Sequence, residues 1–148
     1  MTQTFAEILI LIPSTLTTGH LMFVATVLQG VMNELDEATF GRFVPLLLRK
    51  ATRSVYAVNS STITFVAMIP YFLFYSFQHW WFTAGLGFFV FLSVAGKVLN
   101  LPIYGRIAAL GGGDVAQLKK ERRKLQTANL VRALLCLVST ARMAIQFA

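Results

Sequence analysis

The sequence has few residues that serve metal or thiol chemistry. Its 148 residues include one cysteine, Cys136, and two histidines, His20 and His79. No disulfide can therefore form within the chain, and HExxH, CxxC and paired-histidine spacings are all missing. The two histidines fall at different levels of the predicted membrane domain, which argues against a haem held by both. We expect no metal and no cofactor, and we interpret Cys136 as a buried structural thiol.

Phosphate-binding patterns and acidic residues are also scarce. The glycine triplet 111–113 lacks the lysine and hydroxyl of GxxxxGK[ST], and no strand pattern precedes it. The chain has six acidic and 13 basic residues, for a net charge of +7. Most of the basic residues gather in two segments, 42–53 and 106–124. A basic surface for acidic lipid headgroups accounts for this charge, so we expect membrane lipids and no nucleic acid as partners.

Apolar residues are abundant. They make up 56% of the chain, charged residues only 13%, and the mean hydropathy is +0.66. A spanning helix needs about 20 mostly apolar residues, and four such stretches occur near 6–31, 54–77, 80–103 and 127–147. We predict an all-α membrane protein, a four-transmembrane-helix bundle forming a single integral membrane domain over 1–148. The N-terminal segment has no basic residue before its apolar run and no signal-peptide cleavage pattern. We therefore expect it to be retained as the first span and not removed as a signal peptide.

The basic segments also predict the orientation. They connect spans one and two and spans three and four, so they share one side of the membrane. By the positive-inside rule this is the cytoplasmic, matrix or stromal side, and both termini lie on the outer side. The outer turn FQHWW at 77–81 is short and aromatic, and we expect its histidine to face the interface.

The first basic segment predicts an amphipathic interfacial helix before span two. Asn33 to Asp36 is typical of a helix cap. Apolar residues then share one helical face, opposite three arginines: Phe40, Phe43, Val44, Leu47 and Ala51 against Arg42, Arg49 and Arg53. In the second basic segment, Asp114 is predicted to cap the charged first turns of the helix that enters span four.

Polar side chains inside the spans are costly in lipid and mark candidate sites. At ~1.5 Å of rise per residue, they fall at a similar inner level on all four spans: His20, Asn59, Lys97, Asn100, Asn129 and Arg132. Asn129 and Arg132 share a helical face at i, i+3, as do Lys97 and Asn100. This spacing predicts an inner pocket, with Asn59 and Asn129 as ligand-binding residues.

A structural role is the alternative for the same residues. Lys97 and Arg132 can extend to the headgroups, and Asn100 can receive the carbonyl freed before Pro102, where we expect span three to stop. Near the outer ends, Glu7 and Arg142 are predicted to form an ion pair if their helices are neighbours.

Two motifs resemble a known family. The stretch NLPIYGRIAAL, followed about twenty residues later by RRKLQTANLVRALLCLVS, is similar to the paired signature of the anthrone-oxygenase-like family of small four-span membrane proteins. Asn100 and Pro102 match the asparagine and proline at the end of span three. The arginine and polar positions that enter span four are matched by Arg122, Asn129 and Arg132. Tyr104 and Leu125 stand where the family has an asparagine and a tryptophan.

The resemblance implies a cofactor-free oxygenase. Such chemistry needs a base, donors for an oxyanion and an apolar pocket open to oxygen. It implies His20 as the base and Lys97, Asn100 and Arg132 as oxyanion stabilisers. The ligand would be planar and apolar, such as a quinone, polyketide or lipid.

Two other function classes remain open. The first is a non-catalytic accessory subunit of a larger membrane complex, or a homo-oligomer, which packs through a phenylalanine-rich surface: Phe72, Phe74, Phe88, Phe89 and Phe91. The second is a channel or transporter, for which four short spans show no repeat or broken-helix pair.

Overall fold

The computed structural model describes residues 2–75, 77–111 and 113–148, with the side chains of residues 57 and 61 set aside. The described part is almost entirely helical and contains no strand. The first long element consists of α1 (Gln3–Phe23), a π-helical turn η1 (Val24–Leu28) and α2 (Gln29–Glu34). The remaining elements are α3 (Glu37–Ala51), α4 (Val55–Tyr75), α5 (Trp80–Leu110), α6 (Val115–Ala144) and a short 3-10 turn, η2 (Ile145–Phe147).

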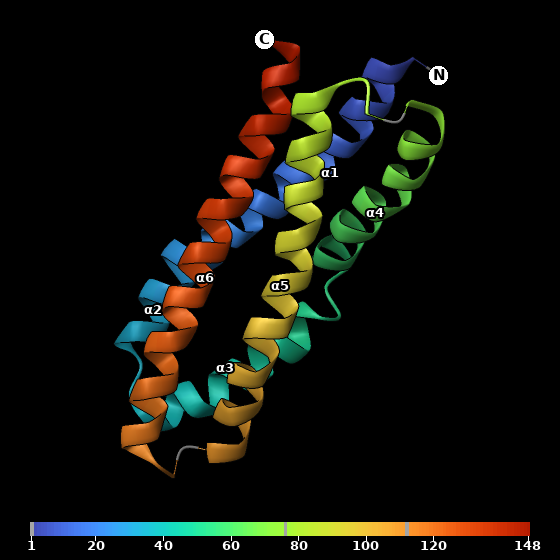
Figure 1. Cartoon of the computed structure of the whole chain (residues 1–148). Helices are drawn as coiled ribbons and strands as arrows, with labels where there is room; N and C mark the ends of the chain where they lie inside the picture. Colours follow the sequence, from blue (N-terminus) through green and yellow to red (C-terminus); the bar gives the residue numbers. More distant parts are fainter. Residues whose placement is uncertain (1, 76, 112) are drawn as a thin grey trace.

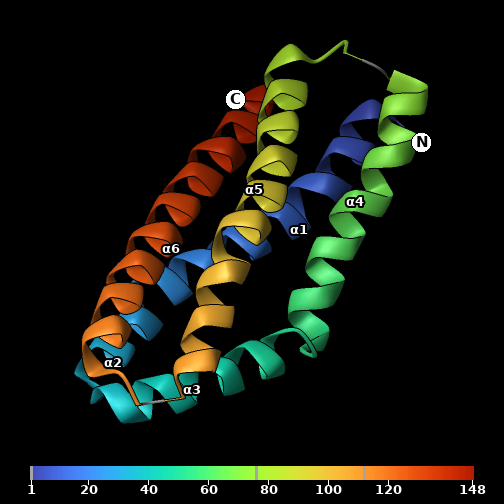
Figure 2. The same cartoon turned by 60° about the horizontal axis from the view of Figure 1, so that its bottom comes forward.

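Four segments are long and apolar enough to cross a membrane: Gln3–Glu34, Val58–Tyr75, Trp80–Leu110 and Val115–Phe147. The prediction of an all-α, four-span membrane fold is confirmed. Helix α5 packs most extensively on α6, and α1 packs on both α4 and α6. Both termini lie at one end of the molecule, while α3 and the α5–α6 turn lie at the other (Figures 1 and 2).

Two aspartates cap the helices that follow the basic segments, as predicted. The Asp36 carboxylate accepts hydrogen bonds from the Thr39 amide at 2.9 Å and the Thr39 hydroxyl at 2.7 Å, which hold the pKa of Asp36 below its ordinary value. Asp114 accepts from the Gln117 amide at 3.0 Å. Helix α5 ends at Gly111, whose φ of 55° is a left-handed conformation that glycine adopts at low cost.

Helix α3 is amphipathic as predicted, and its apolar face packs against protein. Phe40 and Val44 are fully buried in a cluster with Ile103 and Ile107 of α5 and Leu118 of α6. Polar contacts secure the same junction, because Arg122 lies 4.3 Å over the Phe40 ring and donates to the Leu35 carbonyl at 2.9 Å. Helix α3 therefore covers the end of the α5–α6 pair.

Pro102 does not stop the third span, contrary to the prediction. Helix α5 continues through it to Leu110. A proline removes one helical hydrogen bond, and beyond it Ile103 and Ile107 pack under α3. Burial of these two side chains offsets the lost bond, so the helix extends beyond the predicted end of the span.

The outer end also differs from the prediction. Helices α1 and α6 are neighbours, yet Glu7 pairs with His79 and not with Arg142. The buried Glu7 carboxylate lies 2.6 Å from His79 Nδ1 and accepts from the Tyr71 hydroxyl at 3.2 Å. The Arg142 guanidinium lies 4.8 Å over the Trp81 ring, because an aromatic face offers a cation a partner at this level.

One member of the predicted phenylalanine surface is internal. Phe89 is 1% exposed and belongs to a core cluster that joins α1, α4, α5 and α6. Alternation of helical faces explains the difference, since Phe88 and Phe91 lie on the exposed side of α5.

Candidate functional site: a polar cleft between α5 and α6

Two asparagines meet at the inner part of the α5–α6 interface. Asn100 on α5 donates its side-chain amide to the Asn129 carbonyl oxygen on α6 at 3.3 Å. Both side chains are more than nine-tenths buried, with 4% and 7% of their surface exposed. Side-chain amide contacts of this kind link helices in membranes because lipid offers them no partner.

Arg132 lies one turn along α6 from Asn129, and its side chain lies against the backbone of α5 at Gly96. A Cβ added to Gly96 would come within 2.7 Å of Arg132 Cδ and 2.9 Å of Arg132 Cζ, and closer still to Nε. The missing side chain of Gly96 therefore provides the space that the arginine occupies. Gly96 was not identified from the sequence, although it lies one turn before Asn100 on the same face of the helix.

The cluster has hydrogen-bond donors without acceptors. Asn129 Nδ2 and Arg132 Nε are both buried and have no hydrogen-bond partner in the part of the chain that the structure describes. An unsatisfied buried donor costs ~1–3 kcal/mol, and native structures contain few of them. Arg132 Nε can therefore donate to an oxygen atom that comes from outside the described residues.

A cleft of about 90 Å³ adjoins Arg132, and Asn129 is not among its lining residues. Asn100 and Arg132 contribute to its lining, together with Leu92, Leu99 and Val131. Leu99 and Val131 are 65% and 50% exposed, so the cleft lies at a surface that faces the membrane. The arrangement places a cation and amide groups behind an apolar entrance.

The structure brings three of the six predicted site residues together: Asn100, Asn129 and Arg132. His20 is half-buried on α1, with its ring 5.9 Å from the Tyr56 ring on α4. It does not line the cleft. A π-helical turn begins four residues after His20, at Val24. Such turns often occur near functional sites, and no local pattern of residues predicted this one.

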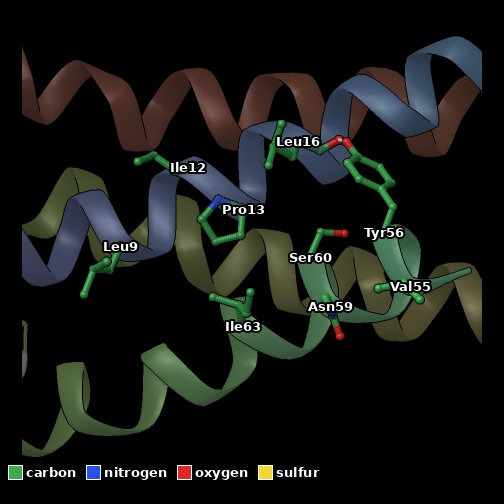
Figure 3. Close-up of a pocket in the computed structure, with 9 residues that line it drawn as sticks. All are labelled: Leu9, Ile12, Pro13, Leu16, Val55, Tyr56, Asn59, Ser60 and Ile63. Atoms are coloured by element: carbon green, nitrogen blue, oxygen red, sulfur yellow. Dashed lines mark hydrogen bonds between the residues drawn. The ribbon is translucent and has the colours of Figure 1, made fainter.

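The other two predicted residues lie elsewhere. The Lys97 side chain is exposed and is not part of the cleft lining. Asn59 lines a separate groove of about 340 Å³ between α1 and α4 (Figure 3). Among the described residues, no group of three or more histidine, cysteine, aspartate or glutamate side chains is placed to hold a metal ion.

Comparison with protein-family models, curated proteins and solved structures gives no match for this chain. The resemblance to the anthrone-oxygenase-like family therefore stays a prediction.

Proposed function

We propose that this protein binds an apolar molecule carrying an oxygen acceptor in the cleft between α5 and α6, and that Arg132 holds this oxygen. The observation that carries the proposal is the buried Arg132 Nε beside the cleft, which lacks an acceptor among the residues that the structure describes. A carbonyl, phenolate or carboxylate oxygen would satisfy it. The positive charge of Arg132 favours an anionic oxygen over a neutral one.

The size of the cleft restricts how a ligand binds. A volume of about 90 Å³ is well below the ~300–1,000 Å³ of sites that enclose drug-sized molecules. The cleft therefore admits only the oxygen-bearing end of the ligand. The apolar body of the ligand lies in the membrane against Leu92, Leu99 and Val131. Quinones, polyketides and lipids with a polar end fit this description.

Oxygenase activity would need a base in addition to binding. Arg132 suits the stabilisation of an enolate or phenolate oxygen. His20 lies outside the cleft lining, so a substrate would have to extend toward α1 to lose a proton to it. Binding is accordingly the function we propose, and oxygen consumption with an anthrone, compared between the natural protein and His20→Ala, tests the catalytic step separately.

We propose the orientation in the membrane from the distribution of the basic residues. The end that carries α3 and the α5–α6 turn holds the basic segments, and it would face the cytoplasm, matrix or stroma, with both termini on the outer side.

A role as an accessory subunit is the second candidate. One observation favours it: the Val58–Tyr75 span is 18% buried, the lowest share among the four spans. Its outer part exposes Ile69, Leu73 and Phe74. These side chains suit either lipid or the helix of a partner subunit.

Native mass spectrometry after gentle extraction from the protein's own membrane separates the candidates. We expect the natural protein to retain a small apolar molecule and Arg132→Ala to lose it. Arg142→Ala is the matched control, because Arg142 also has a buried Nε without a partner but lies at the outer end. A molecule retained equally by Arg132→Ala would refute the cleft as its site, and partner subunits without a small molecule would favour the accessory role.

A further inference from the structure

The groove between α1 and α4 has an apolar lining that opens to the membrane. Pro13 and Leu16 of α1 face Tyr56 and Ile63 of α4 across it (Figure 3). Leu16, Tyr56 and Ile63 are each about half exposed. The Tyr56 hydroxyl donates to the Leu16 carbonyl at 2.9 Å, so its polar atom is already paired. The groove therefore presents mainly hydrocarbon, in a volume of about 340 Å³.

Basic side chains lie where the groove meets the membrane surface. Arg49 and Lys50 are in the last turn of α3, and Arg53 lies two residues before the first groove residue, Val55. All three basic side chains are exposed, and none forms an ion pair in the part of the chain that the structure describes. The sequence contains no aspartate or glutamate between Glu37 and Asp114. The positive charge beside the groove is thus available to an external anion.

We propose that this groove binds one acyl chain of an anionic phospholipid, whose phosphate binds Arg49, Lys50 and Arg53. The site is separate from the cleft at Arg132, and the proposal does not depend on that cleft. Charge complementarity selects the lipid, because a zwitterionic headgroup brings no net charge to the three cations.

The length of the groove agrees with a single leaflet. From Val55 to Ile63, α4 advances about 12 Å, at ~1.5 Å per residue. One leaflet contributes about 15 Å to the hydrocarbon core of a bilayer. A lipid with its phosphate at Arg53 would therefore place most of one acyl chain along the groove.

Titration of the delipidated protein with two lipids of identical chains tests the proposal. We expect native mass spectrometry to show one phosphatidylglycerol bound at least tenfold more tightly than phosphatidylcholine. The triple variant Arg49→Gln, Lys50→Gln, Arg53→Gln should weaken phosphatidylglycerol binding about 100-fold, at about fivefold per cation. Equal affinity of the natural protein for the two lipids would overturn the proposal.

Two further variants separate the groove from general surface charge. The control Lys119→Gln, Lys120→Gln, Arg123→Gln removes the same charge from exposed positions on α6, and we expect its affinity for phosphatidylglycerol to stay within about twofold of the natural protein, because those positions lie outside the groove. A loss as large as that of the first triple variant would refute a specific site. Asn59→Trp places a large ring at an exposed position of the groove lining and should weaken both lipids at least tenfold; unchanged binding would exclude the groove as the acyl site.

Discussion

Gly85 should be the least replaceable glycine on α5. A Cβ added there would lie 2.7 Å from Met143 Cγ, and 2.9 Å from both the Met143 amide nitrogen and the Ser139 carbonyl oxygen. Two of these three atoms belong to the backbone of α6, which cannot move aside as a side chain can. The same contact carries a hydrogen bond of 2.6 Å from the Ser139 hydroxyl to the Gly85 carbonyl. Gly85→Ala must therefore push α5 and α6 apart.

The expected cost follows from three contributions. Overpacking costs ~1–3 kcal/mol, and weakening the Ser139 bond adds ~0.6–1.5 kcal/mol. The better helix propensity of alanine returns up to ~1 kcal/mol. Gly85→Ala should therefore lower the free energy of unfolding by about 1–3 kcal/mol.

Gly87→Ala is the matched control, because a Cβ on Gly87 meets nothing within 4 Å. Gly87→Ala gains helix propensity without overpacking, so the free energies of unfolding of the two variants should differ by about 2–4 kcal/mol. Reversible unfolding with sodium dodecyl sulfate in mixed micelles measures both free energies. If Gly85→Ala unfolds at the same detergent fraction as Gly87→Ala, the close approach of α5 and α6 does not restrict the size of the side chain at residue 85.

Three other perturbations give direct checks. Glu7→Gln removes the charge that pairs with His79 and should lower stability by about 1–3 kcal/mol in the same assay, and an unchanged midpoint would contradict it. Because hydrogen bonding lowers the pKa of Asp36, its cap should stabilise the fold fully above the ordinary pKa of the carboxyl and lose this effect as pH falls through the lower folded value. The non-titrating cap in Asp36→Asn should remove this acid dependence, so identical pH curves would refute it. Single cysteines at positions Thr2 and Arg123, in a background without the native thiol, should react with an impermeant maleimide from opposite sides, and labelling of both from one side would exclude the proposed orientation.

Local signals in the sequence predicted much of the fold. Asp36 and Asp114 cap helices where the sequence indicated, because a cap depends on residues two or three positions away. The four spans follow from composition alone, since lipid requires long apolar helices. Pro102 is the exception, because the packing of α3 beyond it is a long-range effect that the neighbouring residues do not reveal.

The sequence predicted only part of the candidate site. Depth along the helix and i, i+3 spacing indicated Asn100, Asn129 and Arg132. The same depth argument also selected Asn59, and the i, i+3 spacing wrongly placed Lys97 on the face of Asn100, because Lys97 is exposed whereas Asn100 is buried. The role of Gly96 depends on the distance between two helices, and no local pattern encodes that distance.

The helix pairing has a consequence for biogenesis. Spans adjacent in sequence also pack together, α1 with α4 and α5 with α6. The chain can thus enter the bilayer as two consecutive hairpins, and under the proposed orientation the basic connection of each stays on the side where it was synthesised. Assembly then consists of docking one preformed hairpin on the other, through α1 against α6, α3 against α5 and α6, and the Tyr71–Phe82 contact. Residues 1–75 and 80–148, made as separate polypeptides, would each contain a complete hairpin and could reassemble in the membrane.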